Sequence, residues 1–175
     1  MEKPNFQGKK FSLCFRLSGK RKKILRTIFE YFDLDGMKEQ LDYWKYAALV
    51  NEIGMYDSGN ERRQLIEFCA DLEKVIEVFY VMSKHKKKQL QRIPVEYKKT
   101  WKKFNRCTIL VKDEKKNLEG VLKMFSEKHI RLYALAEVTD MLEAVVTLKE
   151  PDDRNRHSSI SFFLCINAML NLIYT

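Results

Sequence analysis

Three residues near the end of the chain, Arg154, Asn155 and His157, are the ones best suited to chemistry. A histidine exchanges a proton close to neutral pH, and an arginine can hold a phosphate together with the charge that develops during its cleavage. The N-terminal amides of a helix that starts here would attract an anion as well. The run therefore predicts a polar, potentially catalytic cluster at the start of the apolar C-terminal stretch.

The same run also has a purely structural interpretation. Asp152 or Asp153 could cap the following helix, which would leave Arg154 and Arg156 in solvent. No metal or other cofactor is expected, because the four cysteines are far apart and the three histidines are too scattered to join them at metal-ligand spacing.

Long helices are the elements expected to position this run. Only six glycines and three prolines occur in 175 residues, which leaves few breaks for many short strands. Asp35-Gly36 is expected to separate the first two helices, and Cys107–Val111 is a short run of strand type. We predict an all-α bundle of five to seven helices as one domain over residues 18–175. Its helices are expected at 18–33, 37–54, 60–83, from Pro94, from Asp113 or Asn117, at 130–148 and over the C-terminal stretch.

A basic arm over residues 1–17 precedes this bundle. From Phe11 to Leu17 apolar and polar residues alternate, which is the period of a strand with Phe11 and Phe15 on one apolar face. Two interpretations follow. The arm packs on the body or on a neighbouring subunit, or it anchors the chain at an anionic membrane, where each basic residue contributes about 1 kcal/mol.

The net charge of +9 is concentrated in two zones. Residues 84–116 hold thirteen basic residues against three acids, and residues 1–33 hold nine against three. Such zones suit a polyanion, either nucleic acid or an anionic lipid surface, although lysines on a solvated helix or at a helix C-terminus need no ligand. The expected contact residues are Lys20, Arg21, Lys22, Lys23, Lys86, Lys87, Lys88, Lys98, Lys99, Lys102 and Lys103.

The segment from Ser158 to Thr175 carries no charge. Its eighteen residues make about 27 Å of helix, which is at the short end for crossing a bilayer. Asn167 and Asn171 fall on one side, where they would suit a partner helix or a water-filled lumen better than lipid. We expect burial in the bundle or a ring of subunits that brings several such helices together, with Asn167, Asn171, Phe11 and Phe15 at its interfaces.

An arginine with a polar neighbour, followed by a histidine at the head of a late helix, resembles the motif of the HEPN family of helical-bundle ribonucleases and RNA-associated proteins. The resemblance implies a HEPN-like bundle in which His157 acts as general acid or base and Arg154 holds the phosphate. Here only two residues separate them, and Asp152 occupies the position with four intervening residues, where it would repel the substrate. We therefore expect a divergent motif and lean toward no enzymatic activity; an active chain would be a metal-independent endoribonuclease.

Size, charge and motif placement together resemble the enhancing type of accessory protein from type VI-B CRISPR loci. The resemblance implies a homo-oligomer at the bacterial cytoplasmic membrane, facing the cytoplasm, that strengthens antiviral defence by an RNA-guided, RNA-cleaving effector, in one form as a pore. A cytoplasmic location is the alternative. RNA is a further expected partner, and a basic RNA-binding helical module is the remaining alternative function.

Overall fold

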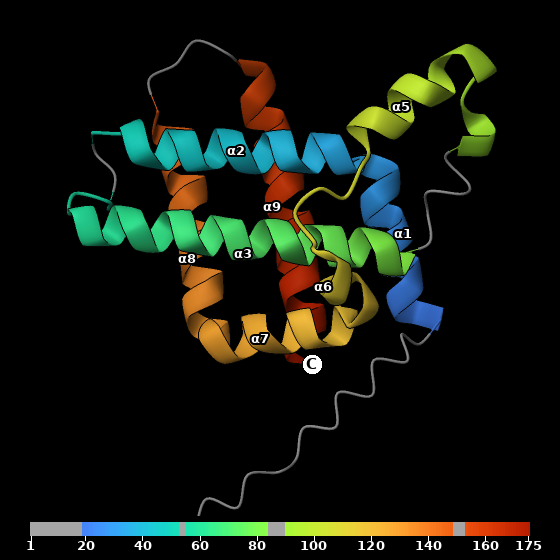
Figure 1. The fold of residues 1–175 in the computed structure, drawn as a ribbon. Coiled ribbons are helices and arrows are strands. Elements are labelled where there is room, and N and C mark those ends of the chain that lie inside the picture. Colours follow the sequence, from blue (N-terminus) through green and yellow to red (C-terminus); the bar gives the residue numbers. More distant parts are fainter. Residues whose placement is uncertain (1–18, 53–54, 84–89, 149–152) are drawn as a thin grey trace, which may run out of the picture.

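The computed structural model describes residues 19–52, 55–83, 90–148 and 153–175, with side chains in the last segment from Ser158 onward. These residues form helices joined by loops, without a strand, as the all-α prediction requires. The helices are α1 (Gly19–Tyr31), α2 (Leu34–Val50), α3 (Gly59–Ser83), the 3-10 helix η1 (Val95–Tyr97), α5 (Lys98–Phe104), α6 (Lys112–Lys116), α7 (Leu118–Lys128), α8 (Arg131–Thr147) and α9 (Asp153–Tyr174) (Figure 1).

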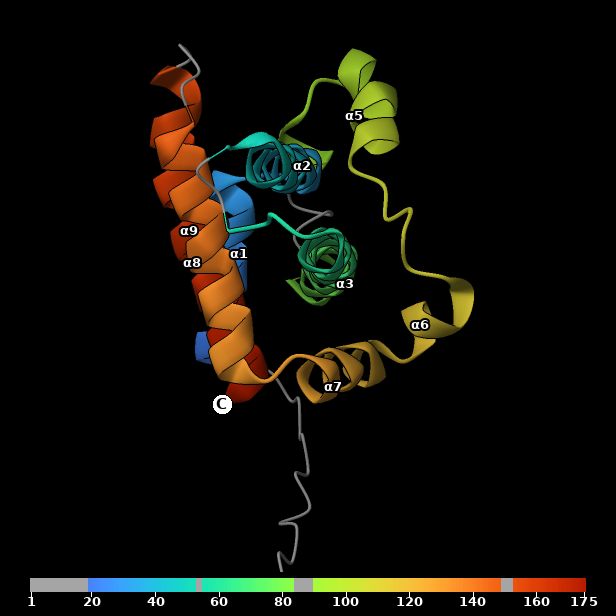
Figure 2. The same cartoon turned by 90° about the vertical axis from the view of Figure 1, so that its left-hand side faces the viewer.

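Two antiparallel helix pairs form the body. α2 and α3 lie side by side, and α8 and α9 form a second layer that runs crosswise behind them (Figures 1 and 2). α1 packs on α3 and α9, and α7 closes the end of the body against the same two helices. The core between the layers includes the fully buried side chains of Phe68, Phe79, Met141 and Phe162.

The region between Pro94 and Lys128 is divided into more helices than predicted. This region divides into η1, α5, α6 and α7, so the described residues hold eight α-helices and one 3-10 helix instead of five to seven. Asn117 is the reason for one division, because it ends α6 and its side chain accepts a hydrogen bond from Gly120 N at 3.0 Å to start α7. Both predicted start points, Asp113 and Asn117, therefore mark a helix.

The predicted break at Asp35-Gly36 is wrong by two residues. Asp33 caps α2, and its Oδ1 accepts a hydrogen bond from Gly36 N at 2.8 Å. Gly36 lies inside the first turn, where a Cβ would come within 3.1 Å of the capping oxygen. The glycine therefore serves the cap rather than the end of a helix.

The strand-type run at Cys107–Val111 forms a loop held by a buried carboxylate, in line with the all-α prediction. Glu77 of α3 is fully buried, and its Oε1 accepts from Thr108 N at 2.7 Å. Its Oε2 accepts from Leu110 N at 2.9 Å, and Ile109 N donates to both oxygens. Lys38 of α2 donates to the same carboxylate. A side chain thus satisfies the backbone donors that would otherwise need a neighbouring strand.

Candidate functional site

The predicted catalytic residues Arg154, Asn155 and His157 lie in the first turns of α9. This helix begins at Asp153, so positions 154 and 157 are one turn apart on the same side of its first turns. The side chains of Arg154, Asn155 and His157 lie outside the described residues, and so does Asp152.

Contacts with α2 fix the head of α9 in place. Trp44 Nε1 donates to Ser159 Oγ at 3.3 Å, and Ser158 Oγ donates to Gln40 Oε1 at 3.2 Å. One turn further, the buried ring of Phe162 meets Trp44 edge to face with ring centroids 4.9 Å apart. The predicted catalytic residues therefore directly precede a part of α9 that is well packed in the core.

The two asparagines of α9 have different surroundings. Asn171 is exposed and its Oδ1 accepts from Arg131 Nη2 of α8 at 3.0 Å. Asn167 is half-buried, and its Oδ1 is closed off from solvent without a hydrogen bond from any described residue. A buried carbonyl oxygen without a donor costs about 1–3 kcal/mol, and a partner could supply a donor here only after the side chain turns outward.

The outer sides of α8 and α9 form a surface that we call the assembly face: Leu132, Ala136, Thr139, Glu143 and Val146 of α8, and Ile160, Leu164, Asn167 and Asn171 of α9. Its large apolar side chains are strongly exposed, with Leu132 at 77%, Ile160 at 57% and Leu164 at 62%. These positions recur every three or four residues on the side of each helix opposite the core. Among the residues that the structure describes, no other helix covers this side of the layer (Figure 2).

Within the described segments, no helix is long and apolar enough to cross a membrane. α9 instead buries one side, including Ile166, Met169 and Leu170, in the core of the bundle. The predicted arm residues Phe11 and Phe15 lie outside the described residues.

The predicted basic contacts divide into three groups. Lys20, Arg21, Lys22 and Lys23 form the start of α1, where positive charge opposes the helix dipole and gains nothing from it. Lys86, Lys87 and Lys88 lie outside the described residues. Lys98, Lys99, Lys102 and Lys103 are on α5, at the far side of the molecule from the assembly face (Figure 2).

A buried polar cluster at the corner of α3, α7 and α8 is not apparent from the sequence. His129 Nε2 lies 2.9 Å from Asp71 Oδ2, and the His129 ring stacks on Tyr133. Tyr56 donates to Glu137 Oε1 at 2.9 Å, and burial raises the pKa of that carboxyl. His129 is only 6% exposed, so this pair of hydrogen-bonded groups serves packing rather than catalysis on a soluble substrate.

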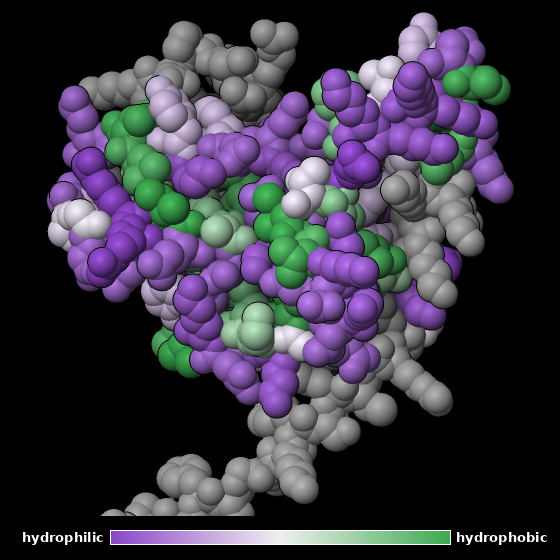
Figure 3. Space-filling view, viewed as in Figure 1, coloured by the Kyte–Doolittle hydropathy of each residue, from purple (hydrophilic) through white to green (hydrophobic). Residues whose placement is uncertain are grey.

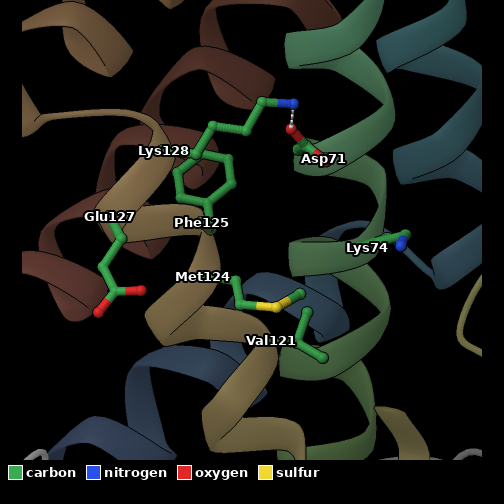
Figure 4. A pocket seen from close by; sticks show the side chains of 7 residues that line it. All are labelled: Asp71, Lys74, Val121, Met124, Phe125, Glu127 and Lys128. Carbon is green, nitrogen blue, oxygen red and sulfur yellow. Dashed lines mark hydrogen bonds and ion pairs between the residues drawn. The ribbon is translucent and has the colours of Figure 1, made fainter.

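A shallow groove of about 440 Å³ runs between α3 and α7 (Figure 4). Val121, Met124 and Phe125 supply its apolar lining. The charged groups at its edge already have partners: Lys128 reaches across to Asp71 at 2.7 Å, and Lys74 binds Glu114 of α6 at 2.7 Å. The groove is therefore the line of contact between α3 and α7, and the charged groups at its edge are already engaged in ion pairs.

Among the described residues, no group of three histidine, cysteine, aspartate or glutamate side chains is arranged to hold a metal ion. In comparisons with known proteins, no family model, curated protein or solved structure matches the chain.

Proposed function

We propose that the chain is an oligomeric accessory protein that acts at the bacterial inner membrane and enhances RNA-guided antiphage defence. The observation that carries the proposal is the assembly face. It presents exposed Leu132, Ile160 and Leu164 on a layer whose α9 half is uncharged from Ser158 to Thr175. Large exposed apolar surface of this kind marks a protein–protein or membrane contact.

A second copy of the chain suits this surface because asparagine side chains can pair with each other across a symmetric interface. Asn171 is the exposed asparagine of this surface that a partner can reach, whereas the Asn167 oxygen is closed off from solvent within the single chain. A buried asparagine in such a seam selects one register at some cost in stability.

Assembly also gives the membrane part of the proposal a mechanism. Several copies would bring several basic-apolar arms, residues 1–17, to one membrane patch, and lipid attraction adds with the number of basic residues. A ring or pore would need a second, different contact between such pairs, because a symmetric interface closes on itself; the effector would be a functional partner.

We expect Ile160→Arg to reduce the purified protein to smaller species, because it places a charge in the centre of the assembly face. Light scattering after gel filtration, in detergent and in buffer, gives the mass. Ile66→Arg on α3 is the matched control, since this isoleucine is 49% exposed on another face and should leave the mass unchanged. Dye release from anionic liposomes should be lost in Ile160→Arg alone. A monomeric native protein that causes no leakage would sink the proposal.

A second candidate, a metal-independent endoribonuclease, is favoured by one feature of α9. Position 157 precedes Ile160 by three residues and Leu164 by seven, so it continues the helical side that forms the assembly face. Assembly would therefore bring two copies of the run close together.

We expect any cleavage of labelled single-stranded RNA to persist in EDTA and to disappear in His157→Ala, because the imidazole would move the proton. His85→Ala is the matched control, as this histidine belongs to a different part of the sequence. Intact RNA after incubation with the native protein would rule out the enzyme and leave the accessory function.

A further inference from the structure

The segment from Val95 to Phe104, comprising η1 and α5, stands away from the helix pairs; we call it the α5 protrusion. Figure 1 shows it beyond the start of α2, and Figure 2 shows it beside the α2–α3 pair, away from α8 and α9. None of its residues is buried, and its contacts are mainly internal, between η1 and α5. Such a helix gains little from packing, so its composition must be explained by something else.

Aromatic rings of the α5 protrusion face solvent. Tyr97 is 62% exposed and Phe104 is 54% exposed, while Trp101 between them is half-buried. The spacing of four and three residues places all three rings on one side of the helix. Figure 3 shows apolar side chains among the hydrophilic ones over this part of the surface. The rings therefore form an uncovered strip rather than a core-facing side.

Basic residues surround this strip. From Arg92 to Arg106 there are six lysines and arginines against Glu96 alone. The four lysines of α5 form no ion pair with a described residue, whereas Lys38, Lys74 and Lys128 in the body each bind a carboxylate. Lys98 and Lys99 lie in the first turn of α5, where the helix dipole disfavours them. Lys102 and Lys103 lie in the last turn, where the dipole favours them, so the four lysines are exposed or half-buried charges that remain open to an anionic partner.

Asn105 attaches the α5 protrusion firmly to the body. This side chain is 2% exposed, and its Oδ1 accepts from Leu34 N at the start of α2 at 3.0 Å. Its Nδ2 donates to the Trp101 carbonyl at 3.3 Å, which ties the last turn of α5 to the same point. The backbone of α5 is therefore held in place before any ligand arrives, which reduces the entropy cost of binding.

We propose that the α5 protrusion binds single-stranded RNA, whose bases stack on Tyr97, Trp101 and Phe104 while its phosphates meet the lysines. Stacking needs only one open ring face and tolerates every base. A lipid surface fits less well, because an interfacial helix buries its whole apolar side in the membrane, and half-buried Trp101 does not allow this. RNA binding here deepens the proposed function by assigning a partner, and it does not require assembly.

Tryptophan fluorescence tests the proposal at this site specifically. The chain has two tryptophans, and Trp44 is buried, so a stacked base can quench only Trp101. Titration with single-stranded RNA of about 20 nucleotides should quench the emission of the native protein and should leave that of Trp101→Phe unchanged. Other basic clusters of the chain can bind RNA, but they cannot produce this quenching.

Affinity measurements separate stacking from charge. Tyr97→Ala and Phe104→Ala should each weaken binding by at least about fivefold, the effect of losing one stacked base. Lys98→Gln together with Lys102→Gln should lower the slope of log K against log salt by about 1.4, since each phosphate contact on a single strand contributes about 0.7. Tyr46→Ala on α2 is the matched aromatic control, because Tyr46 is 51% exposed elsewhere. Ile160→Arg should keep full RNA binding, which separates this proposal from assembly.

Three results would overturn the proposal. The first is a native protein whose tryptophan emission does not respond to the RNA. The second is that Tyr97→Ala and Phe104→Ala weaken the binding of duplex RNA as much as the binding of single-stranded RNA of the same length, since paired bases cannot stack on the rings. The third is that these variants lose binding to anionic vesicles but keep binding to RNA, which would make the α5 protrusion a lipid contact instead.

Discussion

Glu77→Ala is expected to lower the free energy of unfolding by about 3–5 kcal/mol, the usual cost of removing one partner from a buried ion pair. The change removes the acceptor of three consecutive backbone N–H groups in the 108–110 loop and leaves Lys38 without its closest carboxylate. Urea unfolding followed by circular dichroism measures the loss.

Glu73→Ala is the matched control for this prediction. Glu73 lies one turn earlier on α3 and also approaches Lys38, at 3.7 Å, but it is partly exposed and holds no loop. We expect Glu73→Ala to lower the free energy of unfolding by less than about 1 kcal/mol, as for other partly exposed ion pairs. Equal losses in the two variants would mean that the charge pair matters and the loop contacts do not.

The ionisation of Glu77 adds a pH dependence to the same prediction. Burial alone would raise the pKa of Glu77, but hydrogen bonds from Lys38 and from the 108–110 loop outweigh it and lower the pKa. A carboxyl whose pKa is lower in the folded chain stabilises it above the unfolded pKa, near 4.3, and loses that effect as the pH falls through the folded pKa. Glu77→Gln should therefore unfold with a weaker acid dependence than the native chain. An unchanged acid dependence would contradict this assignment.

Phe162→Ala should cost about 3–5 kcal/mol, as for other large-to-small changes of a buried aromatic residue. The Phe162 ring is fully buried and contacts both Trp44 and Phe32 edge to face, so its removal leaves a cavity where α9 meets α1 and α2. Thermal unfolding should show it as a drop in Tm of about 2–4 °C per kcal/mol for a chain of this length.

Phe163→Ala tests whether burial is the cause. This neighbouring ring is only half-buried, so the same substitution should cost clearly less. If both variants lose the same stability, the burial of the Phe162 ring does not explain the effect. Light scattering after gel filtration should also give the Phe162→Ala variant a smaller mass than the assembly, because loosening the start of α9 disturbs the assembly face.

The long helices could be predicted from the sequence because their signal is local. In α3, apolar residues recur every three or four positions from Leu65 to Met82, and the observed start at Gly59 differs from the predicted one by a single residue. α8 was predicted equally well between Ile130 and Leu148. Each of these patterns lies within one element and needs no knowledge of its neighbours.

The features that position the α5 protrusion could not be predicted, because they depend on contacts between distant residues. Glu77 and the 108–110 loop are 31 to 33 residues apart, and Asn105 and Leu34 are 71 apart. A glutamate on a helix and an asparagine in a loop are ordinary solvent residues in any local pattern. The spacing of Tyr97, Trp101 and Phe104 predicted the helix correctly, yet it could not tell that Tyr97 and Phe104 would remain uncovered.

The position of the α5 protrusion, on the opposite side of the α2–α3 pair from the assembly face (Figure 2), has a consequence for affinity. Subunits joined through α8 and α9 would all point their protrusions outward, so bound RNA and the subunit interface would not compete for space. A strand held by one protrusion would meet the next at a high local concentration. Overall binding could then exceed that of a single subunit by about 10²–10⁴ without any new contact, and a weak RNA-binding element would become a tight one only in the assembled protein.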